Sequence, residues 1–282
     1  MNINIFKTGY CIHPEKAAIK SGSFNSVKFP ASFALINHPT KGYILFDTGY
    51  SLRFYEETKK FPYNIYAKIT PVYIKEEETA SKQLEKLGIS SKEISYVILS
   101  HFHADHIGGC FDFPNAKFIC SQKDYMSIKD KKGLSALKNG FIPKLLPNDF
   151  NQRTIFIETK NLINLPIINE EFPVGYDLFD DGSILAVNLE GHSKGQFGIF
   201  LSAKNKTYFF IGDACWLSKS YKELVMPSKI ANIIMSDNKK FIDNINKLHS
   251  FNKNHPHIKI IPSHCLDTLD KEMKLLEDEN ER

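Results

Sequence analysis

Cysteine is scarce in this sequence, and no recognisable pattern uses it. The five cysteines are irregularly spaced and include no C-x-x-C pair: Cys11, Cys110, Cys120, Cys215 and Cys265. The missing pair argues against a thiolate zinc knuckle and against a dithiol redox motif. An odd number of free thiols is typical of a protein from a reducing compartment.

Long hydrophobic runs are absent as well. No stretch reaches the roughly 18 consecutive apolar residues that indicate a membrane-spanning helix. Residues 1–7 contain neither the basic segment nor the apolar run of a signal peptide. We therefore expect a soluble, cytoplasmic protein with no membrane partner.

Neither sign of charge dominates the composition. The 36 basic and 32 acidic residues leave a net charge of +4, and the lysines are spread along the chain. A nucleic-acid-binding surface is usually more concentrated, so no nucleic-acid partner is expected. The 42% apolar and 24% charged residues are those of an ordinary globular protein. The 22 Phe and 12 Tyr are sufficient for a core and for an apolar pocket.

Strand and helix patterns alternate along the chain without an intervening linker. No repeat, low-complexity tract or Pro/Gly/Ser-rich segment divides it, so residues 1–282 are predicted to form one domain. The patterns predict strands at 32–36, 43–46, 94–100, 116–120, 184–189, 196–201, 207–211 and 258–261, and helices at about 77–87 and 238–249. Residues 51–75 are aromatic and irregular, and residues 121–180 mix helix and loop. This order favours two sheets, each covered by helices.

The most specific pattern is the run His101-Phe102-His103-Ala104-Asp105-His106, which directly follows an apolar strand. Imidazole and carboxylate groups are ligands for zinc and similar cations. Three imidazoles and a carboxylate within six residues therefore predict a metal site. The alternative is a polar surface loop that happens to be rich in histidine.

Three later strands place a residue of the same type at their tips. His192 follows the strand at 184–189, Asp213 the strand at 207–211, and His264 the strand at 258–261. A single histidine at a strand end is more often a surface residue than a ligand. Strand ends on one sheet edge converge, however, so these three residues support the metal site predicted from the first cluster.

Taken together, these residues resemble the metallo-β-lactamase superfamily. The elements that carry the resemblance are the histidine cluster, Gly191-His192-Ser193, Gly212-Asp213, His264 and Phe46-Asp47-Thr48-Gly49. Their order and spacing are most similar to the acyl-homoserine lactonase branch, and the likeness runs from about Ser32 to Cys265. It implies an α+β fold, a four-layer αββα sandwich.

The resemblance also implies a ligand set for two divalent metal ions, zinc before manganese or iron. One ion would be held by His101, His103 and His192, and the other by Asp105, His106 and His264, with Asp213 bridging both. Asp47 corresponds to a residue that braces the ligand loops from outside the coordination sphere. A simple turn residue is the alternative for Asp47.

This site implies hydrolysis of a small ester-like substrate. A hydroxide bridging the metals would attack the carbonyl of a lactone or another carboxylic ester, and Asp105 would be the catalytic residue that orients it and passes a proton to the leaving alkoxide. The alternatives are a thioester hydrolase of the glyoxalase II type, a metal-dependent phosphodiesterase and a non-catalytic binding protein. Only about eighteen residues follow His264, too few for the helical region of glyoxalase II.

One position departs from the lactonase pattern. A Tyr that contacts the substrate stands three residues after the bridging Asp in those relatives, and Trp216 occupies that place here. We expect Trp216 to form a wall of the substrate pocket rather than to stabilise an oxyanion. Residues 55–75 and 141–147 are either a lid over an acyl group or part of the core. His13 and His38 are expected at the surface, and a homodimer is left open.

Overall fold

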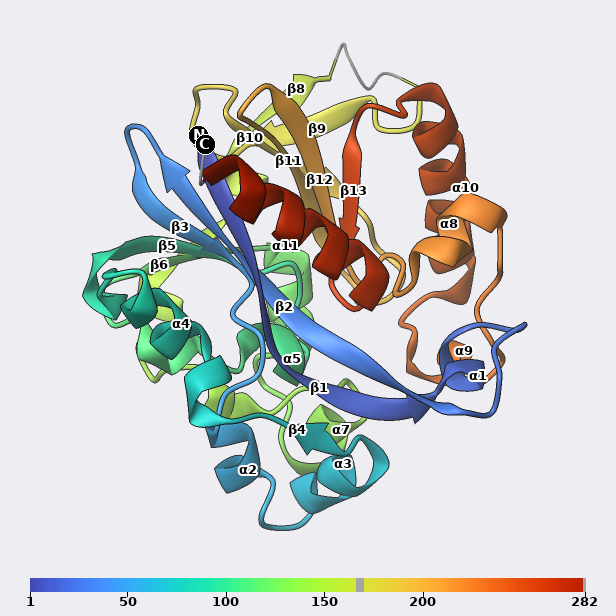
Figure 1. Ribbon diagram of the computed structural model, residues 1–282. Helices are drawn as coiled ribbons and strands as arrows, with labels where there is room; N and C mark the ends of the chain where they lie inside the picture. The colour runs from blue at the N-terminus through green and yellow to red at the C-terminus, as the bar shows by residue number, and fades with distance from the viewer. Residues whose placement is uncertain (166–169, 281–282) are drawn as a thin grey trace.

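In the computed structural model, which describes residues 1–165 and 170–280, two β-sheets face each other and helices cover their outer faces (Figure 1). The first sheet contains, in spatial order, β4 (Val72–Tyr73), β1 (Asn2–Pro14), β2 (Ser26–His38), β3 (Gly42–Phe46), β5 (Ile94–Ile98), β6 (Lys117–Cys120) and β7 (Thr154–Phe156). The second contains β13 (Lys259–Pro262), β12 (Lys206–Gly212), β11 (Phe197–Ala203), β10 (Ile184–Asn188), β9 (Val174–Asp177) and β8 (Asn161–Asn164).

Alternation of side chains along the central strands explains why the sheets stack. In β2, Ala34 and Ile36 belong to the core between the sheets, whereas Phe33 and Leu35 face the outer helices. The strand β12 behaves in the same way, with Tyr208 and Phe210 inward and Phe209 and Ile211 outward. Because successive side chains of a strand point to opposite faces, both faces of each sheet are apolar and both must be covered.

The helices form the two outer layers. The first sheet is covered by α2 (Arg53–Glu57), α3 (Tyr63–Ile69), α4 (Ala80–Lys86), α5 (Ala104–Ile107), α6 (Gln122–Ile128) and α7 (Gly133–Leu137). The second is covered by α8 (Ser218–Glu223) and α10 (Asn238–Asn254), with α9 (Ala231–Ile234) between them in the chain. The predicted α+β, four-layer αββα sandwich is thus confirmed.

Short elements complete the architecture. The helix α1 (Glu15–Ala18) follows β1, and α11 (Leu266–Asn280) lies beside β1 and β13, where Leu269 and Leu276 close one edge of the core between the sheets (Figure 1). Single 3₁₀ turns are η1 (Glu76–Glu78), η2 (Ser91–Glu93), η3 (Cys110–Asp112), η4 (Pro143–Leu145), η5 (Asn151–Arg153) and η6 (Ile157–Thr159). No helix in the described ranges has the length and apolar character needed to cross a bilayer.

Some boundaries differ from those predicted. Residues 51–75, expected to be irregular, contain α2, α3 and β4, because these elements are too short to show a period in the sequence. The helix predicted at 77–87 is divided into η1 and α4. The helix α10 begins as predicted, where the Asp237 side chain accepts hydrogen bonds from the N–H groups of Lys239 and Lys240, but it extends to Asn254 and buries Phe251.

The topology brings several strand ends to one edge. The strand β5 is parallel to β3 and β6, and β12 is parallel to β13. The strand β10 runs in the direction of β12, since both are antiparallel to β11. The carboxyl ends of β3 and β5 in one sheet and of β10, β12 and β13 in the other therefore carry the loops that form the site described below.

Candidate metal centre

All seven predicted metal ligands lie at this edge of the two sheets. His101, His103, Asp105 and His106 follow β5, the last two within α5, while His192, Asp213 and His264 follow β10, β12 and β13. They fall into two groups, in each of which the candidate ligand atoms lie within 4.8 Å of one another. The first donor group is His101, His103, His192 and Asp213, and the second donor group is Asp105, His106 and His264.

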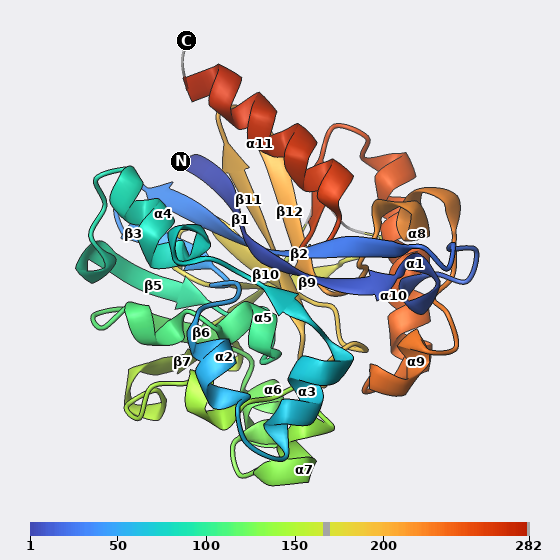
Figure 2. The same cartoon turned by 60° about the horizontal axis from the view of Figure 1, so that its bottom comes forward.

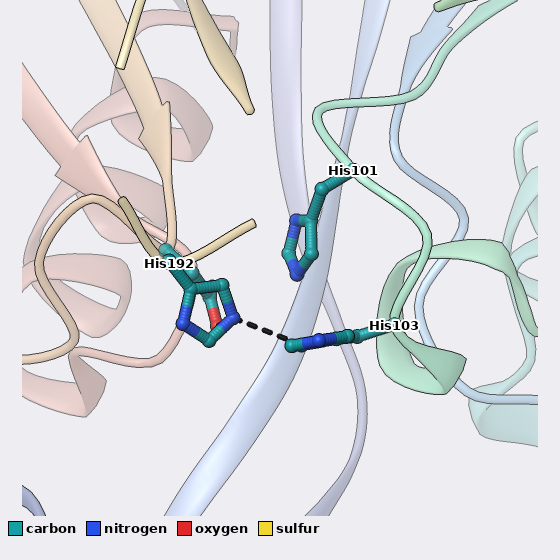
Figure 3. Close-up of side chains that lie close together, drawn as sticks. His101, His103 and His192 are labelled. Carbon is teal, nitrogen blue, oxygen red and sulfur yellow. Dashed lines mark hydrogen bonds and ion pairs between the residues drawn. The ribbon is translucent and has the colours of Figure 1, made fainter. Parts of the chain in front are cut away.

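The three imidazoles of the first donor group point toward a common centre (Figure 3). The Nε2 atom of His192 lies 2.9 Å from Nδ1 of His103. The same Nε2 atom is 3.2 Å from Oδ2 of Asp213. The ring of His101 is the third side, with its centroid 4.6 Å from that of His103 and 4.8 Å from that of His192.

Asp213 also reaches the second donor group. Its Oδ1 atom lies 3.3 Å from Nε2 of His106 and 3.0 Å from Nε2 of His264. The Nε2 atom of His264 is in turn 3.2 Å from Oδ2 of Asp105. Since one oxygen of Asp213 faces His192 and the other faces His106, this carboxylate lies between the two groups.

Three buried atoms of this cluster lack hydrogen bonds of acceptable geometry. They are Nε2 of His101, Nε2 of His106 and Oδ1 of Asp213. A buried polar atom without a partner costs about 1–3 kcal/mol, so three of them in one place call for a partner that side chains do not supply. Imidazole nitrogens and carboxylate oxygens are the donors of divalent zinc. The residues present fit a pair of divalent cations.

The electrostatic setting favours ligand-competent forms in part of the site. Burial lowers the pKa of His192 to about 3, and burial together with His106 and His103 holds the pKa of His101 well below its usual value. Both imidazoles are therefore neutral at neutral pH, which is the form that binds metals. Burial opposes ionisation of Asp213, but the neighbouring His264 and His106 outweigh it and hold the pKa of this carboxyl well below its usual range.

The second donor group holds protons when no cation is bound. Burial disfavours the charged form of His106, but Asp47, Asp213 and Asp105 outweigh it and raise its pKa to about 10. The carboxylates of Asp213 and Asp105 likewise overcome burial and raise the pKa of His264 well above its usual value. A cation that binds these nitrogens must therefore displace protons.

Asp47 is completely buried and holds His106 in place. Its Oδ2 atom lies 2.7 Å from Nδ1 of His106 and accepts a hydrogen bond from the Ser100 hydroxyl at 2.8 Å. Its Oδ1 atom accepts the backbone N–H of Ser100, also at 2.8 Å. These contacts leave Nε2 of His106 facing Asp213, so Asp47 orients the ring rather than merely forming a turn. In a similar way, Nδ1 of His264 lies 2.6 Å from the carbonyl oxygen of Pro30.

Sequence reasoning missed two supports of the site. The backbone of Gly140 packs against the His103 ring so closely that a Cβ atom there would lie 2.6 Å from Cδ2 of His103. The carboxylate of Asp124 accepts the backbone N–H of Gly195 at 3.1 Å, which anchors the loop that carries His192. Neither contact joins residues close in the sequence, so no local pattern indicates them.

A cavity of about 230 Å³ opens above both donor groups. Its floor contains His103, Asp105, His192, Asp213 and His264. Its walls are mostly apolar and comprise Cys11, His13, Ala17, Ala18, Phe29, Tyr50, Tyr66, Ile69, Thr70, Trp216, Ile230, Ala231 and Ile234. Figure 2 shows α3 and α9 in its lower half, away from the chain termini, and both helices contribute to these walls.

The structure places Trp216 and the two segments 55–75 and 141–147 relative to the cavity. Trp216 lines the cavity, and its indole N–H donates to Oδ2 of Asp213 at 2.9 Å. Part of the segment 55–75 lines the cavity through Tyr66, Ile69 and Thr70, whereas Phe141, Ile142 and Leu145 of 141–147 are packed in the core.

Two histidines expected at the surface lie elsewhere. His13 is half-buried and lines the cavity, because β1 extends past the metal centre. His38 is buried and its Nε2 atom lies 2.8 Å from the Ser183 hydroxyl oxygen of the opposite sheet. The Nδ1 atom of His38 accepts two backbone N–H groups, those of Thr40 and Lys41. This ring therefore clamps two turns together, and it has no free nitrogen for acid–base chemistry.

Comparison with known proteins gives consistent results. The family described as "Metallo-beta-lactamase superfamily" matches residues 28–222. An N-acyl homoserine lactonase AttM from Azorhizobium caulinodans is 25% identical over 220 residues, which are 77% of this chain and 76% of that protein. AttM from Agrobacterium fabrum is 23% identical, covering 84% of this chain and 82% of the relative.

Solved structures of the same kind share the fold. An N-acyl homoserine lactone hydrolase, with the product N-hexanoyl-L-homoserine bound at its catalytic metal centre, superposes with a TM-score of 0.71 at 17% identity, over 96% of this chain and 97% of that one. The dizinc quorum-quenching lactonase AidC gives a TM-score of 0.62 at 17% identity, over 94% of this chain and 87% of that one.

Proposed function

Because this chain belongs to the metallo-β-lactamase superfamily and is a metal-dependent hydrolase, we propose that it opens a lactone or another uncharged carboxylic ester at a dinuclear metal centre. The observation that carries the proposal is the pair of donor groups that share Asp213 on the floor of an apolar cavity. The lactonase activity of the relatives that span three quarters or more of this chain supports the same substrate class.

The proposed ligands follow the two donor groups. His101, His103 and His192 would hold one ion, Asp105, His106 and His264 the other, and Asp213 would bridge them. Zinc is the first candidate, with manganese and iron as alternatives, because imidazole and carboxylate donors accept all three. Residues 1–282 would act as one domain, since the ligands come from strands of both sheets.

Two bound divalent cations supply a nucleophile at neutral pH and polarise the substrate carbonyl. Asp105 is the residue that we assign to proton movement. Burial opposes its ionisation, but His106 and His264 lower its pKa to about 2, so it is an anionic acceptor on the cavity floor. One bond forms between the attacking oxygen and the carbonyl carbon, and the bond from that carbon to the ring oxygen breaks. The proton of the attacking group passes by way of Asp105 to the leaving alkoxide.

The cavity walls favour an uncharged acyl substrate over the two alternatives. Among the described residues that line the cavity, none is Lys or Arg. A glutathione thioester carries carboxylates and a phosphodiester carries a phosphate, and both would need cationic partners beyond the metals. The exposed side chains of Ile69, Ile230 and Ile234 at the rim suit an apolar chain that continues toward the solvent.

A substrate panel tests this proposal. Zinc, manganese and iron forms would be assayed with acyl lactones, aliphatic esters, an acyl-glutathione thioester and a phosphodiester. We expect lactones or esters to give the highest kcat/KM and chelation to abolish the activity. Preference for the thioester or the phosphodiester would contradict the substrate assignment, and full activity after exhaustive chelation would contradict the metal mechanism.

Removal of the shared carboxylate tests the dinuclear arrangement. Asp213→Ala should reduce the metal content below two ions per chain and should lower kcat/KM by a factor on the order of 10³ or more, because a bridging ligand and the charge balance of both positions are lost. Asp130→Ala is the matched control, because Asp130 is an exposed carboxylate far from the cavity lining. Two bound ions and normal turnover in Asp213→Ala would refute the bridge.

A further inference from the structure

The N–H group of Trp216 is not available to a substrate. It donates to Oδ2 of Asp213 at 2.9 Å, and an indole has only this one donor. The floor of the cavity otherwise presents imidazoles and carboxylates that belong to the two donor groups. A hydrogen-bond donor for the carbonyl oxygen of an ester must therefore come from another wall.

Among the other polar groups of the walls, the phenol of Tyr66 is the best candidate for this donor. The Tyr50 hydroxyl is engaged, since it bonds to the Cys11 thiol. Thr70 ends α3, away from the floor residues in the chain, and its neighbour Ile69 is 66% exposed. His13 has no resolved electrostatic interaction with either donor group. Tyr66 lines the cavity with both Asp105 and Asp213 among its charged neighbours, whereas Tyr50 has only Asp105 of these two.

The ring of Tyr66 is held while its hydroxyl is left unused. The ring lies edge-on to the completely buried Phe54, with centroids 5.5 Å apart. The helix α3 that carries it is tied to the start of α7, where the Tyr63 hydroxyl accepts the backbone N–H of Gly133 at 3.1 Å. Within residues 1–165 and 170–280, no hydrogen bond engages the Tyr66 hydroxyl. A held aromatic ring with an unengaged O–H group is a preorganised donor.

We propose that the Tyr66 hydroxyl donates a hydrogen bond to the substrate carbonyl oxygen and strengthens this bond as negative charge develops there. The proposal rests on the ester-hydrolase function proposed above. Tyr66 is then a catalytic residue contributed by α3. Trp216 has a different role, because its N–H group donates to Asp213 rather than to the substrate. Burial and the nearby Asp105 raise the pKa of Tyr66 well above its usual value, so the hydroxyl keeps its proton at the pH of the reaction.

The effect should be seen in kcat. Removing one donor to an oxyanion costs about 10²–10³-fold in kcat, and we expect the lower end because the metals share the same oxygen. Tyr66→Phe should therefore lower kcat by about 100-fold, change KM little and leave two metal ions bound. Tyr73→Phe is the matched control, since Tyr73 is an exposed residue of β4 that does not line the cavity.

A binding measurement gives a second readout that does not depend on turnover. Trp216 is the only tryptophan of the chain and lines the cavity, so its fluorescence should report ligand binding. A long-chain alkyl phosphonate monoester carries tetrahedral oxygens in place of the developing oxyanion. We expect the zinc-loaded Tyr66→Phe variant to bind this phosphonate more weakly, by about the same factor as its kcat is reduced. Tyr73→Phe should bind it like the wild type.

The outcomes separate this inference from the proposed function. If the wild type hydrolyses lactones or esters and Tyr66→Phe retains kcat and phosphonate affinity within about twofold, Tyr66 is not the donor although the function stands. If the wild type hydrolyses no ester, both the proposed function and this role of Tyr66 are refuted. A variant with 3-fluorotyrosine at position 66 separates loss of the donor from altered packing, because it keeps the ring and the hydroxyl and only makes the hydroxyl more acidic. Activity near that of the wild type supports the donor, and a loss equal to that of Tyr66→Phe refutes it.

Discussion

Replacing Asp47 by Asn should weaken one metal position more than the other. Asp47 contacts His106 of the second donor group directly, through the 2.7 Å approach of its Oδ2 atom to Nδ1. The variant keeps the size of the side chain, and its remaining oxygen can still accept the N–H of Ser100. The new amide N–H groups, however, would face the proton on Nδ1 of His106. The ring must then change its tautomer or turn, and either change disturbs Nε2, the atom that faces Asp213.

The magnitude follows from the role of such partners. Loss of a carboxylate that orients a ligating histidine typically lowers metal affinity by about 10–100-fold, which is about 1.4–2.7 kcal/mol. We expect this loss at the second donor group. The first donor group should change less, because Asp47 reaches its residues only indirectly. It reaches His101 through the Ser100 hydroxyl, whose oxygen lies 3.1 Å from Nδ1 of His101, and Asp213 through His106.

The assay is a zinc titration of the metal-free protein in competition with a chromophoric chelator. Two classes of site should be resolved, and only one of them should be shifted strongly in Asp47→Asn. Asp130→Asn is the control for loss of one negative charge at the exposed surface. Equal affinities of wild type and Asp47→Asn at both positions, within about twofold, would refute the idea that this carboxylate tunes the centre.

Two further predictions concern the same site. Gly140→Ala should lower both the melting temperature and the zinc affinity of the first donor group, since the new Cβ would lie 2.6 Å from the His103 ring. Gly133→Ala is the matched control. Both glycines have a positive φ, 56° at Gly133 and 61° at Gly140, but a Cβ at Gly133 would have nothing within 4 Å. If the two variants behave alike, the contact with His103 has no influence. Zinc binding at pH 7 should release protons, because His106 has its pKa raised to about 10, and isothermal titration calorimetry in buffers of different ionisation enthalpy measures this release. In the metal-free protein, the raised pKa of His106 stabilises the fold. This stabilisation is complete below the pKa of about 6.5 that His106 has in the unfolded chain, and it is lost as the pH rises toward 10. The melting temperature should therefore fall between pH 7 and 9.5. A melting temperature that rises over this range, or binding without proton release, would contradict the assignment.

The candidate metal ligands could be picked out because each of them follows a recognisable local pattern. Four lie within the six residues His101–His106, and the other three follow apolar strands whose common direction places their ends together. Asp47 was singled out only by the resemblance to the superfamily, and the choice between a brace and a turn residue needed the contact with His106. The chemistry of a site depends on its residue types, and these can be read directly from the sequence.

The walls of the cavity could not be predicted in this way. Tyr66 belongs to a segment that looks irregular, and it reaches the site only because its ring packs on Phe54. The segment 141–147 resembles a lid in composition, yet its apolar side chains are in the core. Trp216 was expected as a wall, whereas its bond to Asp213 depends on a rotamer that no sequence pattern encodes.

The patterns of the amino-acid sequence by themselves indicated two sheets covered by helices, and residues of metal-ligand type at the ends of their strands, because alternation and spacing are local properties of a chain. The four-layer arrangement was expected from the resemblance to the superfamily. The tertiary structure alone decided which tyrosines line the cavity, which glycine supports His103 and which segment is packed in the core. Those features arise from packing between residues far apart in the chain, and the free energy of such contacts depends on shape rather than on residue order.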